Sequence, residues 1–185
     1  SFTSQPDRFQ NDTDANKSPG WGAFTDTKAT ATVTGSVRAQ FKSRFDGESS
    51  DIYMDMHIPG DSAREYATVL APINGANPAP YNNKKIPTLV VRRTGAAWNN
   101  PFGVIYEPHR DGADGGTVQN VTPLKTGTKV VGMKVESIVD GEDMTHYIIA
   151  NTGANDVYED PAIGLYFKGR FAIASHREEG SGELY

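Results

Sequence analysis

Polar and apolar residues alternate with a period of two through most of this chain, and this alternation limits the fold more than any other feature of the sequence. From residue 28 to residue 176, short segments rich in β-branched and aromatic residues end at Pro, Gly or Asn. No segment of ten or more residues carries the apolar stripe of a helix. The pattern predicts an all-β protein with little or no helix, folded as an antiparallel β-sandwich that is either jelly-roll-like or a two-layered sheet.

The segment "SDIYMDMHI", residues 50–58, shows the alternation clearly. One face of the predicted strand carries the apolar side chains Ile52, Met54 and Met56, and the other face carries Tyr53, Asp55 and His57. Further along the chain, "TKVVGMKVESIVDGEDMTHYIIAN" is predicted to form two strands joined at Asp140-Gly141. The segment "IGLYFKGRFAIASH", residues 163–176, is predicted to be a second hairpin or one long strand bent at Gly169.

Residues 1–28 lack any strand or helix period, so we expect an irregular N-terminal arm there, followed by one β-sandwich domain at residues 29–185. The net charge of -5 and the lack of any basic run argue against nucleic-acid binding. The absence of cysteine excludes disulfides, thiolate metal sites and a cysteine nucleophile. No stretch approaches the roughly 20 apolar residues of a membrane helix, so no membrane partner is expected.

The stretch "RRTGAAWNNPFGVIYEPH", residues 92–109, concentrates side chains suited to binding a sugar. A tryptophan offers a flat face for a sugar ring, amides suit hydroxyl groups, and a guanidinium suits a carboxylate or sulfate. Because neighbouring residues of a strand point to opposite faces, only one of the two arginines can face a given ligand. A tryptophan that closes the end of a sandwich explains the same residues, and we favour that structural role for Trp98. The predicted substrate-binding residues are Arg92, Arg93, Trp98, Asn99, Asn100 and His109.

The sequence offers no self-contained catalytic motif. Its four histidines form neither an HxH nor an HExxH pair, and no GxSxG motif is present. The loop at residues 109–116 brings Asp111 and Asp114 among glycines, but calcium usually needs more carboxylates, so we expect a flexible acidic loop without a metal. A self-contained glycoside hydrolase, a third possibility that we do not favour, would need two carboxylates in one cleft, and Glu107 with Asp111 or Asp114 is the only pair that could be nominated. No catalytic residue, metal or cofactor is therefore predicted.

Three segments of the chain resemble the β-sheet portion of polysaccharide lyases of the heparinase II/III type. They are "YMDMHIPGDSAREYATVLAPI", "PTLVVRRTGAAWNNPFGVIYEP" and "GRFAIASHRE". The second segment carries an Arg-x-x-Gly-x-x-Trp-x-x-Pro-Phe pattern, formed by Arg92, Gly95, Trp98, Pro101 and Phe102. The resemblance covers roughly residues 30–178.

The resemblance implies β-elimination on an acidic polysaccharide, in which a base removes the proton beside a uronate carboxylate while a neighbouring group neutralises that carboxylate. In this family the catalytic side chains come chiefly from a helical toroid domain, so no catalytic residue is assigned to this chain. The expected function is that of a β-sandwich module, inactive alone, which supports or lines the cleft of a periplasmic or extracellular bacterial lyase. Its expected partners are the acidic polysaccharide or oligosaccharide and the helical catalytic domain of the same protein.

An alternative function is a stand-alone carbohydrate-binding or surface-interaction module without catalysis. The sequence upstream of Ser1 is expected to separate the two hypotheses, because a helical domain with Asn, Tyr and His there favours the lyase.

Overall fold

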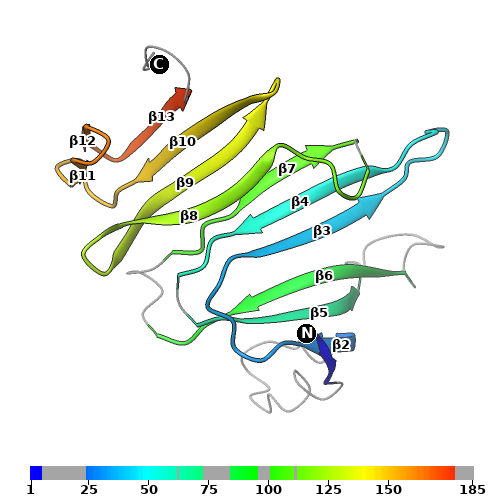
Figure 1. Cartoon of the computed structure of the whole chain (residues 1–185). Helices are drawn as coiled ribbons and strands as arrows, with labels where there is room; N and C mark the ends of the chain where they lie inside the picture. Colours follow the sequence, from blue (N-terminus) through cyan, green and yellow to red (C-terminus); the bar gives the residue numbers. More distant parts are fainter. Residues whose placement is uncertain (6–23, 62, 73–83, 96–100, 111, 178–185) are drawn as a thin grey trace. The chain divides into compact units, whose positions relative to one another are not determined.

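The computed structural model describes residues 1–5, 24–61, 63–72, 84–95, 101–110 and 112–177. Within these ranges the chain forms thirteen strands and no helix, which confirms the prediction of an all-β fold (Figure 1). None of the described segments is a helix with the length and apolar character needed to cross a lipid bilayer. The chain divides into two compact units, the first made of Ser1–Thr34 and Ser62–Gly95 and the second of Gly35–Asp61 and Ala96–Tyr185.

The first unit is an antiparallel sheet of four strands in the order β1-β2-β5-β6. These strands are β1 (Thr3–Ser4), β2 (Thr25–Ala29), β5 (Glu65–Pro72) and β6 (Lys85–Arg92). Tyr66 and Val69 of β5 are almost fully buried and form part of its core. The first 28 residues were predicted to be irregular, whereas β1 and part of β2 lie in this range and pair with each other. Residues 6–23 lie outside the described residues, and the predicted domain boundary stays a prediction.

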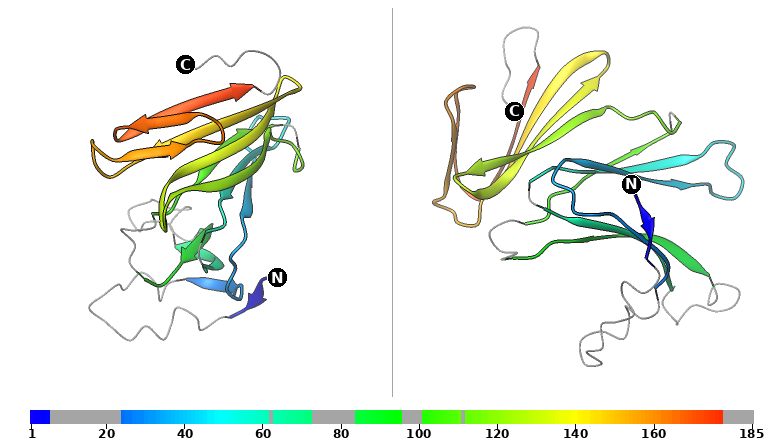
Figure 2. Two further views of the ribbon diagram at one scale, coloured as in Figure 1. Left: turned by 60° about the vertical axis from the view of Figure 1, so that its left-hand side comes forward. Right: turned by 60° about the horizontal axis from the view of Figure 1, so that its bottom comes forward.

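The described residues of the second unit form three antiparallel sheets, with strand orders β3-β4-β7, β13-β10-β9-β8 and β11-β12 (Figures 1 and 2). Their strands are β3 (Val37–Ser43), β4 (Ile52–Ile58), β7 (Ile105–His109), β8 (Val118–Thr126), β9 (Lys129–Val139), β10 (Glu142–Ala150), β11 (Val157–Asp160), β12 (Leu165–Lys168) and β13 (Phe171–Arg177). The finer prediction of a two-layered or jelly-roll-like sandwich stays a prediction.

The predicted hairpin at Asp140-Gly141 is confirmed. Strands β9 and β10 pair antiparallel from Val139 and Glu142 onward, and the two turn residues have φ angles of 54° and 83°. Positive φ at both central positions is what a tight two-residue hairpin turn requires, and an Asp-Gly pair adopts it at low cost. Local sequence is therefore sufficient to fix this turn.

The second predicted hairpin is wrong in both of its forms. Strand β12 pairs with β11, while β13 pairs with β10, so residues on the two sides of Gly169 belong to different sheets. The buried Asn151 stabilises the segment in which the chain passes from one sheet to the other, because its side-chain Nδ2 donates to the carbonyl oxygens of Asp156 and Gly169. A hydrogen bond from an asparagine distant in sequence replaces the turn that the local pattern suggested.

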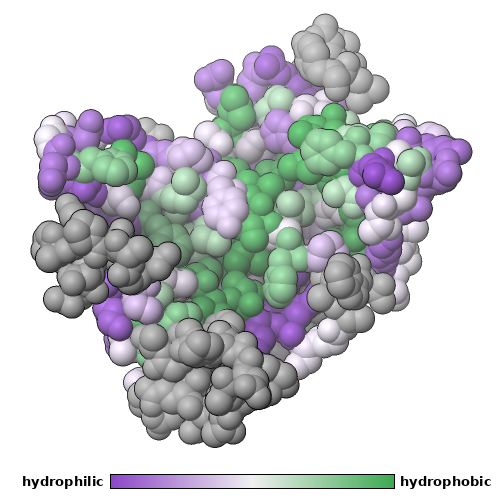
Figure 3. All heavy atoms as spheres, turned by 180° about the vertical axis from the view of Figure 1, so that it is seen from behind, coloured by the Kyte–Doolittle hydropathy of each residue, from purple (hydrophilic) through white to green (hydrophobic). Residues whose placement is uncertain are grey.

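The β11-β12 hairpin covers one face of the β13-β10-β9-β8 sheet. Tyr158 of β11 forms a buried cluster with Leu124, Val131 and Ile149 of that sheet, and Leu165 and Phe167 of β12 pack against it. Other apolar side chains of the second unit remain exposed, including Tyr106, Tyr166, Phe171 and Ile173. Figure 3 colours the described residues by hydropathy, with hydrophobic residues in green.

Strand β4 buries the face that its sequence marks as polar. Tyr53, Asp55 and His57 are buried, whereas Met54 and Met56, on the opposite face, are half-exposed. The alternation that was predicted for this strand is present, but the buried side is the one that carries the ionisable residues. Burying charged and polar groups is costly unless they find partners, so this face requires a network of hydrogen bonds.

Candidate functional site

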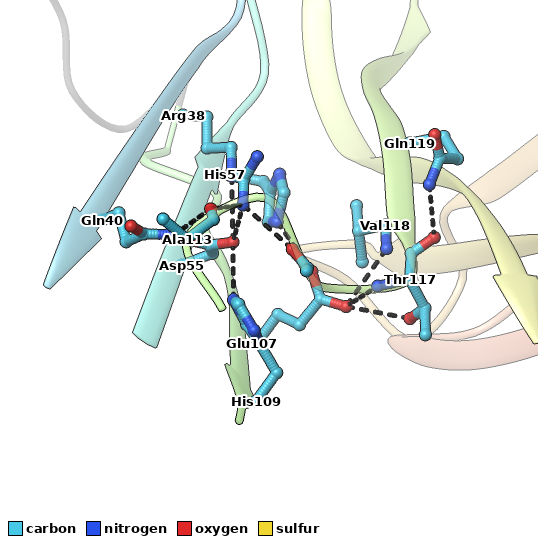
Figure 4. A network of polar contacts seen from close by, with 11 residues as sticks. Arg38, Gln40, Asp55, His57, Glu107, His109, Ala113, Thr117, Val118 and Gln119 are labelled. Carbon is cyan, nitrogen blue, oxygen red and sulfur yellow. Dashed lines mark hydrogen bonds and ion pairs between the residues drawn. The ribbon is translucent and has the colours of Figure 1, made fainter. Parts of the chain in front are cut away.

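The polar face of the β3-β4-β7 sheet gathers six ionisable or amide side chains (Figure 4). Residues directly opposite one another in antiparallel strands project to the same side of a sheet. The register places Gln40 opposite Asp55 and Asp55 opposite Glu107. In the adjacent rows, Arg38 is opposite His57 and Tyr53 is opposite His109. Strand pairing alone therefore brings together residues that are up to 71 positions apart, from 38 to 109.

Asp55 is the centre of this network and its side chain is fully buried. Its Oδ2 accepts a hydrogen bond of 2.9 Å from Arg38 Nε and a second bond from Arg38 Nη2. Its Oδ1 accepts from Gln40 Nε2 at 2.9 Å, and His109 Nε2 lies 3.1 Å from Oδ2. Burial by itself raises the pKa of Asp55, but the hydrogen bonds from Arg38, Gln40 and His109 outweigh it, so that pKa lies below its usual value.

Glu107 has partners on both of its carboxylate oxygens. Oε2 lies 3.0 Å from His57 Nε2. Oε1 accepts from the backbone N–H and the hydroxyl of Thr117 and, at 3.1 Å, from the backbone N–H of Val118. Burial favours a raised pKa here too, but the bonds from Thr117, Val118 and His57 together lower the pKa of Glu107. A carboxylate held ionised in this way is poorly suited to act as a general acid.

The segment between β7 and β8 is fastened to the same face. Arg38 Nη2 donates to the carbonyl oxygens of Ala113 and Gly115, at 3.2 and 3.1 Å, and Gln40 Nε2 donates to Ala113 at 2.8 Å. Gly116 has a φ of 105°, and a Cβ at this position would lie 2.9 Å from a carboxylate oxygen of Glu107. The close approach of this segment therefore depends on glycine at residue 116.

His109 is packed into the network. Its ring stacks on Tyr53 with a centroid separation of 5.4 Å and an interplanar angle of 14°. Its side chain is 6% exposed, and its Nδ1 is buried without a hydrogen-bond partner among the described residues. The prediction placed His109 in a loop after the strand end, whereas it is the last residue of β7 and its Nε2 is bound to Asp55. Whether it binds substrate stays a prediction.

A polar pocket of about 240 Å³ opens beside the network. Its wall includes Ser36, Arg38, His57, Asp114, Gln119 and Asn120. Arg38 Nε and Nη2 are bound to Asp55 and to backbone carbonyls, while Nη1 has no partner among the described residues. His57 likewise bonds to Glu107 through Nε2 and leaves its other ring nitrogen without a described partner. The pocket therefore presents oriented donors together with acceptors, a combination that suits a polar ligand.

Asp55, His57 and Glu107 also have the composition of a metal site, since their potential ligand atoms lie within 4.8 Å of one another. Both oxygens of Asp55 are already bound, however, and Arg38 supplies the positive charge beside it. Glu107 Oε1 is bound to Thr117 and Val118. A metal ion would have to separate His57 from Glu107 and compete with a guanidinium for Asp55. The arrangement fits a hydrogen-bonded network better than a metal centre.

The other predicted binding residues lie in the first unit or outside the described residues. Arg92 is exposed and donates to Glu65 Oε2 from Nε at 3.0 Å and from Nη2 at 2.7 Å, as a cross-strand ion pair. Arg93, just after β6, is half-buried. Trp98, Asn99 and Asn100 lie outside the described residues, so their predicted roles stay predictions. Strands β6 and β7, on either side of these residues, belong to different sheets and do not pair with each other.

The nominated hydrolase pair gains no support. Both carboxylate oxygens of Glu107 are hydrogen-bonded, one to His57 and the other to the start of β8. Asp114 lies on the wall of the pocket, and Asp111 is outside the described residues. Arg38, Gln40, Asp55 and His57 were not among the predicted site residues. The sequence did contain a signal for Asp55 and His57. A triplet that begins with an acidic residue and ends with a histidine occurs on two strands, as Asp55-Met56-His57 and as Glu107-Pro108-His109. Residues two apart on a strand share a face, so each triplet places a carboxylate beside an imidazole.

Comparison with known proteins relates the chain to polysaccharide lyases. Residues 118–185 match the family described as the C-terminal domain of endo-acting ulvan lyase. Over 157 residues, or 85% of this chain, the sequence is 38% identical to an endo-acting ulvan lyase of Formosa agariphila. The chain spans 18% of the length of that protein. No solved structure matches the chain.

These matches confirm the resemblance to polysaccharide lyases, while the heparinase II/III type in particular stays a prediction. The chain is thus similar to an endo-acting ulvan lyase, and its residues 118–185 match the model of the C-terminal domain of that family.

Proposed function

We propose that this chain is a β-sheet module of a polysaccharide lyase and that it holds the acidic polysaccharide on which the enzyme acts. The similarity to an endo-acting ulvan lyase carries the proposal, because it extends over 85% of the chain at 38% identity. Ulvan is therefore the first polysaccharide to test. The finer assignment to the heparinase II/III type belongs to the same proposal and rests on the pattern from Arg92 to Phe102.

The module binds polysaccharide, and the elimination takes place on a helical catalytic domain of the same protein. Two features of the second unit support this division. Glu107 is held as a carboxylate by Thr117, Val118 and His57, and Asp55 is held by Arg38, Gln40 and His109. Groups fixed by so many partners are suited to shaping a surface, whereas a general base must be free to gain a proton during each turnover. The pocket beside them provides the surface.

We propose a periplasmic or extracellular location in a bacterium. The reason is the size of the substrate, since an endo-acting enzyme meets its polysaccharide before it has been cut into pieces small enough for uptake. The net charge of -5 also fits a protein whose polysaccharide contact is a local pocket rather than a broad basic surface.

Two measurements on the 185-residue chain test this function. In affinity electrophoresis, ulvan in the gel should retard the chain, while a neutral glucan should not. In a spectrophotometric assay with ulvan, the chain should release no unsaturated uronate. Lack of retardation by ulvan would show that the module does not hold this polysaccharide. Steady release of unsaturated product would show that the chemistry lies within the chain.

A further inference from the structure

We propose that the pocket between β4 and the start of β8 is a subsite for one anionic sugar residue, whose carboxylate or sulfate is bound by Arg38 Nη1. The inference rests on the proposed function and goes beyond it by naming the place and the chemistry of the contact. All of the residues that form the pocket belong to the second unit.

Arg38 is oriented before any ligand arrives. Its Nε and Nη2 are fixed by Asp55, Ala113 and Gly115, which leaves Nη1 with two N–H donors and no partner among the described residues. The side chain is 42% exposed, so water and ligand can reach it. A guanidinium that is already held in place loses little conformational entropy on binding, and its planar geometry matches a carboxylate or a sulfate.

The other residues of the wall suit the hydroxyl groups of a sugar. Asp114 can accept hydrogen bonds from hydroxyls. The side-chain nitrogens of Gln119 and Asn120 already donate to Thr117 and Glu136, which leaves their amide oxygens as acceptors. His57 contributes a ring nitrogen, because its Nε2 is the one bound to Glu107. The wall therefore combines one anion-binding group with several hydroxyl-binding groups.

The balance of charge selects a singly charged sugar over a dense polyanion. Arg38 is the basic residue of the wall, and it is paired with Asp55 while Asp114 stands on the same wall. A ligand with several anionic groups would meet repulsion from these two carboxylates. The volume of about 240 Å³ lies below the roughly 300–1,000 Å³ of pockets for drug-sized ligands, which fits one sugar ring with the rest of the polysaccharide outside.

The first test is an NMR titration with three sugars that share one ring: glucose, glucuronate and glucose 6-sulfate. We expect glucuronate or glucose 6-sulfate to shift the Arg38 Nε–H signal and the amide signals of Gly115, Gly116 and Gln119, with glucose giving much smaller shifts. The two charged sugars distinguish a carboxylate from a sulfate as the bound group. Equal shifts with glucose, or shifts that lie elsewhere in the chain, would overturn the proposal.

The second test uses variants and affinity electrophoresis in ulvan. Arg38→Lys keeps a positive charge beside Asp55 but removes Nη1, so its affinity should fall about tenfold or more, as expected for the loss of hydrogen bonds to a charged group. Ser36→Trp blocks the pocket from an exposed position outside the network and should weaken binding at least as much. Arg177→Lys is the matched control, since Arg177 is exposed and paired with Glu142, and it should bind as wild type does.

A thermal melt of each variant separates binding from folding. If Arg38→Lys does not fold, Ser36→Trp alone carries the test. Wild-type affinity in folded Ser36→Trp would overturn the subsite while leaving the proposed function intact. If the wild-type chain itself does not bind ulvan but shows the expected shifts with a charged sugar, the subsite stands and the choice of ulvan fails.

Discussion

Glu107 Oε2 lies 3.0 Å from His57 Nε2, and the other oxygen of the same carboxylate accepts hydrogen bonds from Thr117 and Val118. A single side chain of β7 thus joins β4 to the beginning of β8. Asp55 makes the equivalent connection between β3, β4 and β7, since it binds Arg38 and His109. These two acids therefore determine the position of the pocket wall.

The stability of the chain should fall in acid because of Asp55 and Glu107. Both pKa values are lowered in the folded state, so both groups stabilise the fold above their unfolded pKa values of about 4 and lose this contribution as the pH falls below that range. Urea denaturation between about pH 7 and pH 3 measures the free energy of unfolding across this window. Glu107→Gln cannot titrate and should show a shallower loss below about pH 4. Equal pH dependence in the variant and the wild type would contradict the role given to Glu107.

Asp55→Ala should be strongly destabilising. Removing one partner of a buried ion pair leaves unpaired polar groups, and the expected cost is roughly 3 kcal/mol, at the low end for such pairs because Arg38 keeps contact with water. The matched control is Glu142→Ala, which breaks the exposed pair between Glu142 and Arg177 and should cost about 0–1 kcal/mol. Urea denaturation of both variants gives the comparison. Similar losses would show that Asp55 is no more than a surface charge.

Gly116→Ala should cost more than Gly112→Ala, although both glycines precede β8 and have positive φ angles, of 105° and 88°. At either position the left-handed backbone costs an alanine about 1–3 kcal/mol. At Gly116 the new Cβ would also lie 2.9 Å from Glu107 Oε2, whereas at Gly112 it would meet no atom of the described residues within 4 Å beyond its chain neighbours. Melting temperatures measure the difference. A larger drop for Gly112→Ala would argue against the close packing of this segment on Glu107.

Divalent zinc should not stabilise the chain. Asp55, His57 and Glu107 resemble a ligand set, but Arg38, Gln40 and backbone N–H groups already occupy their oxygens. A metal that binds only the folded state raises the melting temperature with its concentration. We therefore expect the same melting temperature with zinc sulfate, with EDTA and in buffer alone. A rise with zinc that Asp55→Asn abolishes would show that the metal displaces Arg38.

Much of the strand pattern was predictable from the sequence. The period of two determines that residues 52–58 form a strand with Tyr53, Asp55 and His57 on a common face, and the Asp140-Gly141 pair determines its hairpin. These features depend on neighbours in sequence, where side-chain direction and backbone φ are set locally. The lack of any helical stripe likewise determined the fold class.

The candidate site was decided by the tertiary structure. The sequence indicates which side chains of β4 share a face. Hydrophobicity suggests that the face with Met54 and Met56 is buried, whereas in the structure the buried face carries Asp55 and His57. Burial of Asp55 is stable because residues from distant segments form hydrogen bonds with it. These residues are Arg38, 17 positions before Asp55, and His109, 54 positions after it. Hydrogen bonds between residues so far apart leave no periodic signal along the chain, and they offset the cost of burying a charge only once the strands have paired.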